Sequence, residues 1–404
     1  MNVLDKSAIR ECTSCQMCGA VCPKDAISIE LNKDGFYRPV VNAEKCIDCG
    51  ICTKVCYKFD KEIRITSDEG LKHMPLYAAA AKSDELVAQV TSGGIADLLA
   101  KELIKEGYTC IGVGYDDTKA RAYHYAANTA EETDGFRGSK YIQSYSLQAF
   151  QELVKNCRQK RYAVFGTPCQ VYAIHRFLEQ RKIRNQFILI DLYCHGCPSI
   201  HIWTKYQSEV KAKIQKSYFD KVEFRSKIKG WGGGYVVAII VGGVKAFISS
   251  PKCDEFYEMF FSDHVLNKAC SDCKLRSTME YTDIRLGDFW GRKYALNKRG
   301  VSAVSLITNR GDELFQKIAP QIENELCKYD EFLPFQSYGK EYHLNLDLRK
   351  RLLDILSDVN RPLMDAVKLY HNNQSIIQIL KRYIKHMLYY MPIAVTKYIK
   401  RYIL

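Results

Sequence analysis

Short runs of apolar residues recur through the middle of the chain, and turn residues separate them from segments with helical periodicity. These runs are residues 76–81, 108–114, 160–166 and 187–193. Apolar residues at helical spacing fill segments 95–104 and 167–178, which follow a Ser-Gly-Gly turn and a Thr-Pro pair. Strand, turn, helix and strand in this order predict βαβ units. We therefore expect an α/β domain, which we place at residues 75–345.

Two shorter regions predict antiparallel structure. Residues 235–241 and 244–249 are apolar runs joined by Gly242-Gly243, which indicates a hairpin added to the α/β domain. Near the N-terminus, residues 26–30 predict a short strand, and residues 32–35 its turn.

The C-terminal segment, residues 360–404, combines a helical pattern with positive charge. Basic residues lie between the apolar positions of segment 376–390, and a second short basic helix is expected after Pro392. A helix of this kind can lie in a membrane interface and meet anionic lipid. Docking on the chain's own surface, or on a partner, is the alternative and the slightly favoured explanation.

Seventeen cysteines among 404 residues are the unusual feature of the composition. No apolar leader precedes the first cysteine motif, so we expect a cytoplasmic protein, peripheral at the inner face of the membrane if the tail binds lipid. In a reducing compartment the thiols are better explained as metal ligands than as disulfides. The formal net charge of +13 comes with no helix-turn-helix, zinc-finger or RNA-binding motif, so no nucleic-acid partner is expected. No apolar stretch is long enough to predict a membrane-spanning helix.

Two N-terminal motifs share the spacing C-x₂-C-x₂-C-x₃-C. In two-cluster bacterial ferredoxins, the fourth cysteine of each motif ligates the other cluster. We therefore expect two 4Fe–4S clusters, the first on Cys12, Cys15, Cys18 and Cys56, and the second on Cys46, Cys49, Cys52 and Cys22. The module takes residues 1–66 and predicts an α+β ferredoxin-like fold. Zinc is the alternative. A zinc site takes four ligands, which usually occur as pairs along the sequence, and this does not explain two runs of four cysteines.

Residues beside the cysteines agree with this interpretation. Pro23 ends the first motif, and Gly19 and Gly50 are expected to let the backbone fold close to the inorganic sulfide. One departure is Tyr57, which stands where a second proline would follow Cys56. Because that position shapes a turn and is not a ligand, the departure does not change the prediction.

Within the α/β region, several phrases occur in an order that carries more information than any one of them. They are Ser92-Gly-Gly94, Arg137-Gly-Ser-Lys-Tyr141, Phe165-Gly-Thr-Pro-Cys169, Asp191-Leu-Tyr-Cys-His-Gly196 with Pro198-Ser199, Phe224-Arg225, Gly230-Trp231 and Gly287-Asp-Phe-Trp290. Together they resemble the beta-subunit family of coenzyme F420 hydrogenases and dehydrogenases over roughly residues 75–300. A fused N-terminal ferredoxin also occurs in that family.

The resemblance implies an iron–sulfur flavoprotein that binds FAD. It also suggests a third 4Fe–4S cluster, for which Cys169, Cys194, Cys270 and Cys273 are the expected ligands and Cys197 competes for the second position. Two of these cysteines follow predicted strands, where open α/β sheets place their sites. Buried free thiols remain the alternative.

Candidate cofactor contacts follow from residue type and position. A glycine turn at a helix N-terminus favours an anion, although a plain tight turn is also consistent with it. The candidates for binding the flavin or lining its ring and substrate are Ser92, Gly93, Gly94, Ser139, Lys140, Arg225, Lys227 and Trp231. For the basic residues, solvated surface is the competing explanation. His195 is a candidate proton donor, with a structural role as the alternative.

The preferred function is an oxidoreductase that passes electrons between the clusters, FAD and a small organic substrate, either a deazaflavin or a molecule of a polysaccharide pathway. Its electrons would come from, or go to, a redox partner protein or soluble carrier. The alternative is an electron-transfer subunit without a substrate of its own, which relays electrons to a separate enzyme. An open flavin pocket would favour the first function, and a closed flavin beside a large apolar contact surface the second.

Overall fold

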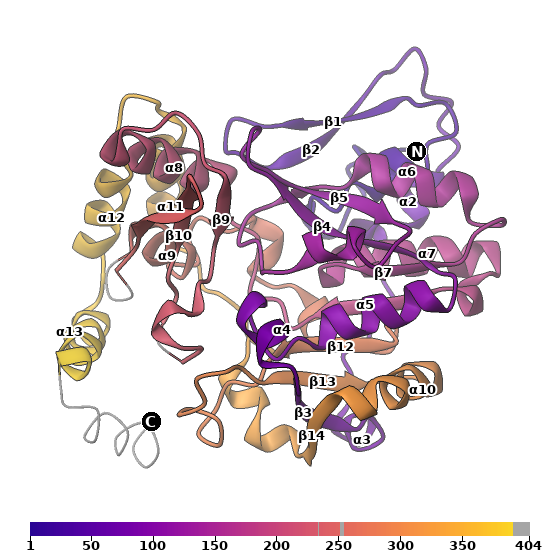
Figure 1. The fold of residues 1–404 in the computed structure, drawn as a ribbon. Coiled ribbons are helices and arrows are strands. Elements are labelled where there is room, and N and C mark those ends of the chain that lie inside the picture. Colours follow the sequence, from indigo (N-terminus) through magenta and orange to yellow (C-terminus); the bar gives the residue numbers. More distant parts are fainter. Residues whose placement is uncertain (233, 251–253, 391–404) are drawn as a thin grey trace.

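The computed structural model describes residues 1–404 except 233, 251–253 and 391–404, and omits some side chains of the last helix. A mixed sheet of nine strands forms the centre of the described chain (Figure 1). Its strands are β3 (Leu76–Ala81), β4 (Thr109–Asp116), β5 (Arg121–Ala127), β6 (Ser144–Tyr145), β7 (Tyr162–Phe165), β8 (Ile188–Leu192), β12 (Ile284–Asp288), β13 (Ser302–Leu306) and β14 (Ile322–Cys327). They are arranged in the order β14-β3-β13-β12-β8-β7-β4-β5-β6.

The βαβ predictions have different outcomes. β7 and β8 are adjacent and parallel, and α7 (Pro168–Arg181) connects them as expected. β3 and β4, joined through α5 (Ile95–Lys105), also run parallel, but β13, β12, β8 and β7 lie between them. The pattern therefore predicted the elements correctly, whereas strands from later in the chain separate the first pair.

Helices cover both faces of the sheet, because successive side chains of each strand point to opposite sides. On β7, Ala163 faces a core formed with α5 and α10 (Asn309–Ile318). Tyr162 and Val164 face the other core, which α6 (Leu147–Asn156) and α7 share. A capping box of Thr167 and Gln170 begins α7, and Pro168 occupies its first turn.

The N-terminal module belongs to that second core. Its elements are α1 (Met17–Ala20), the antiparallel strands β1 (Ile27–Leu31) and β2 (Tyr37–Val41), and α2 (Ile51–Lys54). The buried Gln16 side chain accepts hydrogen bonds from the backbone of Ser146 and Leu147 at 2.8 and 3.0 Å, where α6 begins. One apolar cluster contains residues of both the module and the sheet's helices, so the module is fixed to the body rather than tethered to it.

Residues 58–73, between the cysteine motifs and the central sheet, are also attached to the body. They contain α3 (Asp68–Lys72), and Thr66 accepts a hydrogen bond from Met279 and donates one to Glu280. Sequence composition alone could not show these contacts, because the partners lie more than 200 positions away.

A second lobe lies beside the sheet (Figure 1). It contains the three-stranded antiparallel sheet β11-β10-β9 and a group of helices. These elements are β9 (Lys221–Glu223), β10 (Ala238–Val241), β11 (Val244–Ile248), α8 (Ile200–Ile214), α9 (Glu255–Phe260), α11 (Leu346–Ser357) and α12 (Leu363–Asn372); the short helix α4 (Asp84–Gln89) lies apart, next to β3. The predicted hairpin is confirmed, and both turn glycines, Gly242 and Gly243, have positive φ.

The boundary between the packed body and the C-terminal tail lies later in the chain than the expected residue 360. Leu363, Ala366 and Val367 of α12 are buried in the lobe's core, so the helix at 363–372 packs with α8, α9 and α11. The helical pattern had placed this segment in the tail because its partners are distant in sequence.

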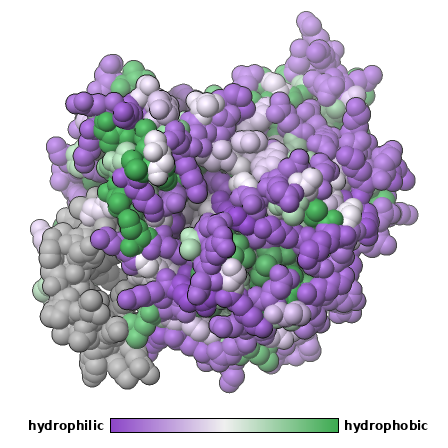
Figure 2. All heavy atoms as spheres, viewed as in Figure 1, coloured by the Kyte–Doolittle hydropathy of each residue, from purple (hydrophilic) through white to green (hydrophobic). Residues whose placement is uncertain are grey.

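The next helix, α13 (Ile376–Tyr390), has the helical structure expected, and its Ile377, Leu380 and Ile384 are exposed. The second basic helix expected after Pro392 lies outside the described residues. Hydrophilic side chains cover most of the face in Figure 2, with small hydrophobic areas between them. No described helix has both the length and the apolarity needed to cross a membrane.

Candidate metal centres

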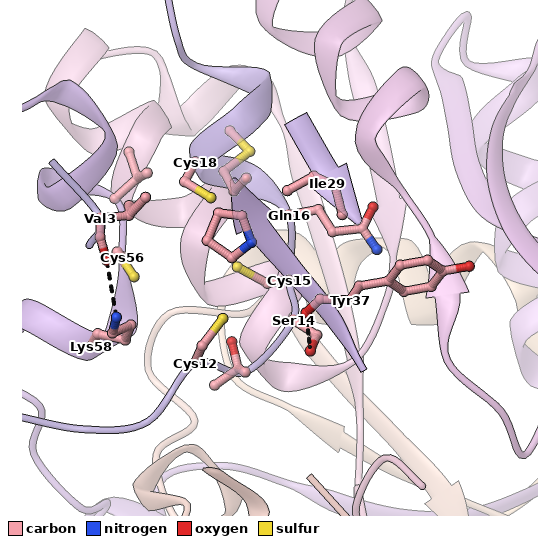
Figure 3. Close-up of a pocket in the computed structure, with 14 residues that line it drawn as sticks. Val3, Cys12, Ser14, Cys15, Gln16, Cys18, Ile29, Tyr37, Cys56 and Lys58 are labelled. Carbon is pink, nitrogen blue, oxygen red and sulfur yellow. Dashed lines mark hydrogen bonds between the residues drawn. The ribbon is translucent and has the colours of Figure 1, made fainter. Parts of the chain in front are cut away.

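Four cysteines of the N-terminal module surround an inner space. Cys12, Cys15, Cys18 and Cys56 turn their sulfur atoms toward it (Figure 3). Apolar side chains, among them Val3 and Ile29, complete the walls. The space measures about 410 Å³ when the solvent at its mouth is included. These are the four cysteines expected to share the first cluster, although Cys56 lies 38 positions after Cys18.

The other four cysteines surround an outer space of about 330 Å³, again including solvent. Cys46, Cys49 and Cys52 come from the second motif and Cys22 from the first, as the exchange of fourth ligands predicts. Cys49 is exposed, whereas Cys15 and Cys18 of the inner group are buried. The outer group therefore faces water, and the inner group lies in the shared core.

The two motifs have the same backbone shape. Ser14 and Asp48, at equivalent positions, have φ of 64° and 49°, and Gln16 and Gly50 have φ of 68° and 75°. Gly50 has the positive φ that the prediction relies on, whereas Gly19 lies in α1 without positive φ. A Cβ there would stand 2.8 Å from Leu147 Cδ1, so Gly19 serves close packing on the body rather than a cofactor-side turn.

These residues fit an iron–sulfur cofactor in their chemistry. Burial raises the pKa of Cys15 and Cys56 to about 12 each, so the bare thiols are neutral at pH 7. Metal coordination supplies the positive charge that makes a buried thiol a thiolate ligand. Among the described residues, no three His, Cys, Asp or Glu side chains come close enough to hold a single metal ion. Four sulfurs spread around one larger space fit a cluster of several irons.

Five cysteines of the body form a third group. They are Cys169 at the start of α7, Cys194 and Cys197 after β8, and Cys270 and Cys273 after α9. Neighbouring thiols in the group contribute to the raised pKa values of four of them, and the largest cause for each is burial. The structure thus brings together the four cysteines expected for a third cluster. Cys194 and Cys197 both lie near Cys169 and Cys270, so the choice between them stays open.

The inner group and the third group are neighbours. After burial, Cys15 contributes most to the raised pKa of Cys169, and Tyr57 lies beside Cys273. The Tyr57 hydroxyl accepts a hydrogen bond of 3.0 Å from the backbone N–H of Lys274. The residue that departs from the ferredoxin pattern therefore joins the ferredoxin module to the loop that carries Cys273.

A buried ion pair holds the same loop from the other side. Arg285 on β12 binds both carboxylate oxygens of Asp191 on β8, at 2.8 and 2.6 Å, and neither side chain is exposed. The guanidinium also donates to the carbonyls of Arg276 and Thr278, at 3.1 and 2.8 Å. Tyr281 donates a further 2.7 Å bond to Asp191.

The Ser-Gly-Gly turn packs tightly against the sheet. Gly94 has a φ of 87° at the start of α5, and a Cβ on Gly93 would lie 2.4 Å from the Ala79 carbonyl oxygen. Ser92 donates its hydroxyl to Val301, and the backbone of Ser139 donates to Thr91. These contacts account for the glycines by packing and do not test whether the turn binds an anion.

The basic candidates are engaged by the protein itself. Lys140 Nζ lies within hydrogen-bonding distance of four backbone carbonyls, those of Val113, Gly135, Phe136 and Arg137. Lys227 Nζ donates to the Val87 and Ser92 carbonyls at 2.7 Å each, and burial lowers its pKa to about 8. Solvated surface, the competing explanation, is therefore wrong for Lys140 and Lys227.

Arg225 and Trp231 meet at Asp288, which lies in the Gly287-Asp-Phe-Trp290 phrase. Arg225 pairs with its carboxylate, and Trp231 Nε1 donates to the same group at 2.9 Å. Trp290 stacks on Trp231 with ring centres 4.7 Å apart and an angle of 6°. Arg225 is buried, and its Nη2 has no hydrogen-bond partner among the described residues. A buried N–H of this kind fits an acceptor atom supplied by a ligand.

Protein groups lie near both ring nitrogens of His195. Nδ1 lies 3.0 Å from both Ser337 Oγ and Tyr342 Oη, and Nε2 lies 2.9 Å from Asp263 Oδ1 but makes no hydrogen bond to a described residue. The contacts favour the structural role, and the catalytic role remains a prediction.

Two family matches cover the candidate sites. Residues 11–58 match the 4Fe-4S dicluster domain and contain all eight N-terminal motif cysteines. Residues 159–331 match the family described as the C terminus of the coenzyme F420 hydrogenase/dehydrogenase beta subunit, and they contain the five cysteines of the third group.

Similar individual proteins are distant. An uncharacterized protein of Methanocaldococcus jannaschii is 26% identical over 191 residues, which cover 41% of this chain and 52% of that protein. The chain thus spans about half the length of the curated relative it matches. In the solved F420-reducing NiFe hydrogenase complex of Methanosarcina barkeri, a chain is 20% identical with a TM-score of 0.47, covering 74% of this chain and 92% of its own. At that score the likeness supports no argument below.

Proposed function

We propose that the chain is an iron–sulfur flavoprotein oxidoreductase, because residues 159–331 match the C terminus of the coenzyme F420 hydrogenase/dehydrogenase beta subunit and residues 11–58 match a 4Fe-4S dicluster domain. It exchanges electrons between an external one-electron carrier and a small organic substrate. A deazaflavin or a polysaccharide-pathway molecule is the substrate class. The inner and outer cysteine groups hold two 4Fe–4S clusters, and the third group holds another.

One observation carries this proposal: the inner group and the third group are neighbours within one packed structure. Cys15 contributes to the raised pKa of Cys169, and Tyr57 spans the boundary. The order along the molecule is therefore outer group, inner group, third group. A ferredoxin module that served only as a detachable carrier would not need to share its core with the body.

For the flavin, the site around Arg225 is the best supported. Its unpartnered Nη2 can donate to a flavin oxygen or phosphate, and Trp231 and Trp290 form an aromatic wall beside it. Lys227, held close to Ser92, adds positive charge on the same side. A flavin bound there would supply the conversion between one-electron and two-electron transfer. The protein residues bind and orient it, and Asp288 holds Arg225 in place.

The competing function is a relay subunit without its own substrate, working beside a separate redox enzyme. The family's description as a beta subunit favours this function, because it indicates work with other subunits. The two functions differ in one respect: only the oxidoreductase consumes an organic acceptor by itself.

The test is the iron, sulfide and flavin content of protein purified without oxygen, with visible spectra before and after dithionite. About twelve irons and one FAD per chain would support the oxidoreductase. About eight irons and no flavin would overturn it in favour of the relay. Cys157→Ser, at a buried cysteine outside the three groups, is the matched control and should leave the content unchanged.

The basic C-terminal helix is proposed to bind an anionic membrane surface. Exposed Ile377, Leu380 and Ile384 recur at helical spacing, and residues 366–404 contain no Asp or Glu. Sedimentation with phosphatidylglycerol vesicles, compared with phosphatidylcholine vesicles, tests this. Leu380→Asp, an exposed position, should abolish binding, and equal binding to both vesicle types would contradict the electrostatic part.

A further inference from the structure

Three arginines from distant parts of the chain surround the third cysteine group. Arg276 is the most central, with 4% of its surface exposed. Its guanidinium donates to the carbonyls of His195, at 2.9 Å, of Lys340, at 2.7 Å, and of Cys270. It also lies 4.1 Å from the centre of the Tyr342 ring. Arg276 thus stands directly behind the loops that carry Cys194 and Cys270.

Arg38 and Arg349 reach the group from two other elements, β2 and α11. Arg38, on β2 of the ferredoxin module, donates to Asn267 at 3.2 Å, and Asn267 donates its backbone N–H to the Cys197 carbonyl. Arg349, on α11, is 8% exposed and donates to the Leu266 carbonyl at 2.6 Å. Both guanidinium groups lie within 6 Å of the Phe36 ring centre.

These cations have no carboxylate partner. Among the described residues, no ion pair within 4 Å includes Arg38, Arg276 or Arg349, and their hydrogen bonds go to uncharged oxygens. Buried charges are normally paired, because an uncompensated charge away from water is costly. Glu11, Asp34 and Asp272, which make no ion pair with these arginines, are in contact with water and therefore screened. Thiolates of the cysteine group would supply negative charge that balances the arginines away from water.

The ferredoxin groups have weaker positive surroundings. Beside the inner group, Lys58 is half-buried and donates to the Val3 carbonyl, and Arg38 donates to the hydroxyl of Ser14, which lines that group. Beside the outer group, Lys24 is exposed, and the N-terminal ammonium forms an ion pair with Asp48. Exposed charges are screened by water and salt, whereas buried ones are screened much less. Arg38 is shared between the inner and third groups, whereas the buried Arg276 and Arg349 lie beside the third group, which makes it the most strongly electropositive of the three sites.

Reduction adds one negative charge to an iron–sulfur cluster, and charge near the cluster is one of the factors that set its reduction potential. Nearby buried cations stabilise the reduced form relative to the oxidised form. We propose that Arg276, Arg38 and Arg349 give the third cluster the highest reduction potential of the three, so that an electron entering at the ferredoxin module comes to rest at the third cluster. This inference rests on the proposed third cluster.

The electrons balance in single steps. A reduced low-potential one-electron carrier would be the electron source, and clusters held by the outer, inner and third cysteine groups would supply one-electron passages from it to the acceptor. Two such passages supply the two electrons that an organic acceptor needs, and its protons come from water. No net electron remains on the protein after the acceptor leaves.

The test is a redox titration of the full chain, followed by electron paramagnetic resonance, which assigns a midpoint to each cluster. In the unaltered protein the third cluster should be reduced first. Arg276→Gln should move its midpoint toward those of the ferredoxin clusters, and Arg276→Lys, which retains the charge, should restore most of the shift. Arg38→Gln, at a less buried site, should move it in the same direction by less, while exposed Arg361→Gln should have no effect.

Arg276 also orders its loop, so Arg276→Gln protein could fail to assemble; the Arg38→Gln titration then decides. This inference is overturned if the third cluster is present but is reduced last, or if the arginine substitutions do not change its midpoint potential. Either result leaves the proposed function standing. An iron content of about eight, with only two cluster signals, overturns the third cluster itself and this inference with it.

Discussion

The cysteine groups of the N-terminal module and the cysteine group of the body differ in how the chain positions their thiols. In the module, two loops of identical spacing repeat the same backbone, with positive φ at Ser14 and Gln16 and again at Asp48 and Gly50. In the body, the thiols come from separate loops after β7, β8 and α9, and buried Arg285 and Asp191 hold one of those loops in place. The first arrangement is local and repeated, and the second depends on the tertiary structure.

The difference predicts how each site responds to damage. A contiguous loop keeps three of its ligands together even if its surroundings change. A site assembled from distant segments loses its geometry when any one segment moves. The following four predictions test this comparison, beginning with the largest effect.

Removing a fourth cysteine should show which loop its cluster belongs to. Cys56→Ser should remove the inner cluster and leave the outer one, although Cys56 follows the outer group's cysteines in the chain. Cys22→Ser should do the reverse. Iron content and resonance spectra check this, and loss of the outer cluster in Cys56→Ser protein would refute the exchange of ligands.

Breaking the buried ion pair should damage the third site alone. Asp191→Asn leaves Arg285 charged and buried, and should lower the free energy of unfolding by about 3–5 kcal/mol. Iron should fall by about four atoms per chain while both ferredoxin signals remain. Denaturant unfolding and iron analysis measure the two effects. Glu69→Gln, in the exposed pair with Lys72, is the control and should change stability by at most about 1 kcal/mol.

Tyr57→Phe tests the junction between the two regions. It removes the acceptor for the Lys274 N–H and should cost about 1–3 kcal/mol, because that donor loses its partner. The titration midpoint of the third cluster should change more than that of the outer cluster. Tyr218→Phe, at an exposed ring, should leave both unchanged. Equal effects of the two variants would mean that the hydrogen bond does not couple the regions.

Gly50→Ala should have the smallest effect. An alanine at a φ of 75° costs about 1–2 kcal/mol, since the left-handed region crowds its Cβ. Gly50→Asn should cost less, because asparagine tolerates this conformation. Thermal unfolding of the cluster-loaded protein compares them, and an equal loss for both would point to crowding rather than backbone strain.

Much of the architecture was predictable from local patterns. The strands near 76–81, 108–114, 160–166 and 187–193, the helices after them and the Gly242-Gly243 hairpin all occur. Their periodicity and turn residues act over a few positions, so a single sequence is enough to detect them. The order of strands was not predictable in the same way, because β12 and β13 enter the sheet from more than 100 residues downstream of β4.

The candidate sites follow the same division. The sequence by itself determined the grouping of the eight N-terminal cysteines, because fixed spacings of two and three residues constrain where thiols can lie. It also indicated the cysteines of the third group, but only through a resemblance. Tertiary structure alone decided that Arg38, Arg276 and Arg349 converge on that group, that Tyr57 joins the module to the body, and that α12 is part of a core. These contacts connect residues far apart in the chain, and neither spacing nor periodicity carries information across such separations.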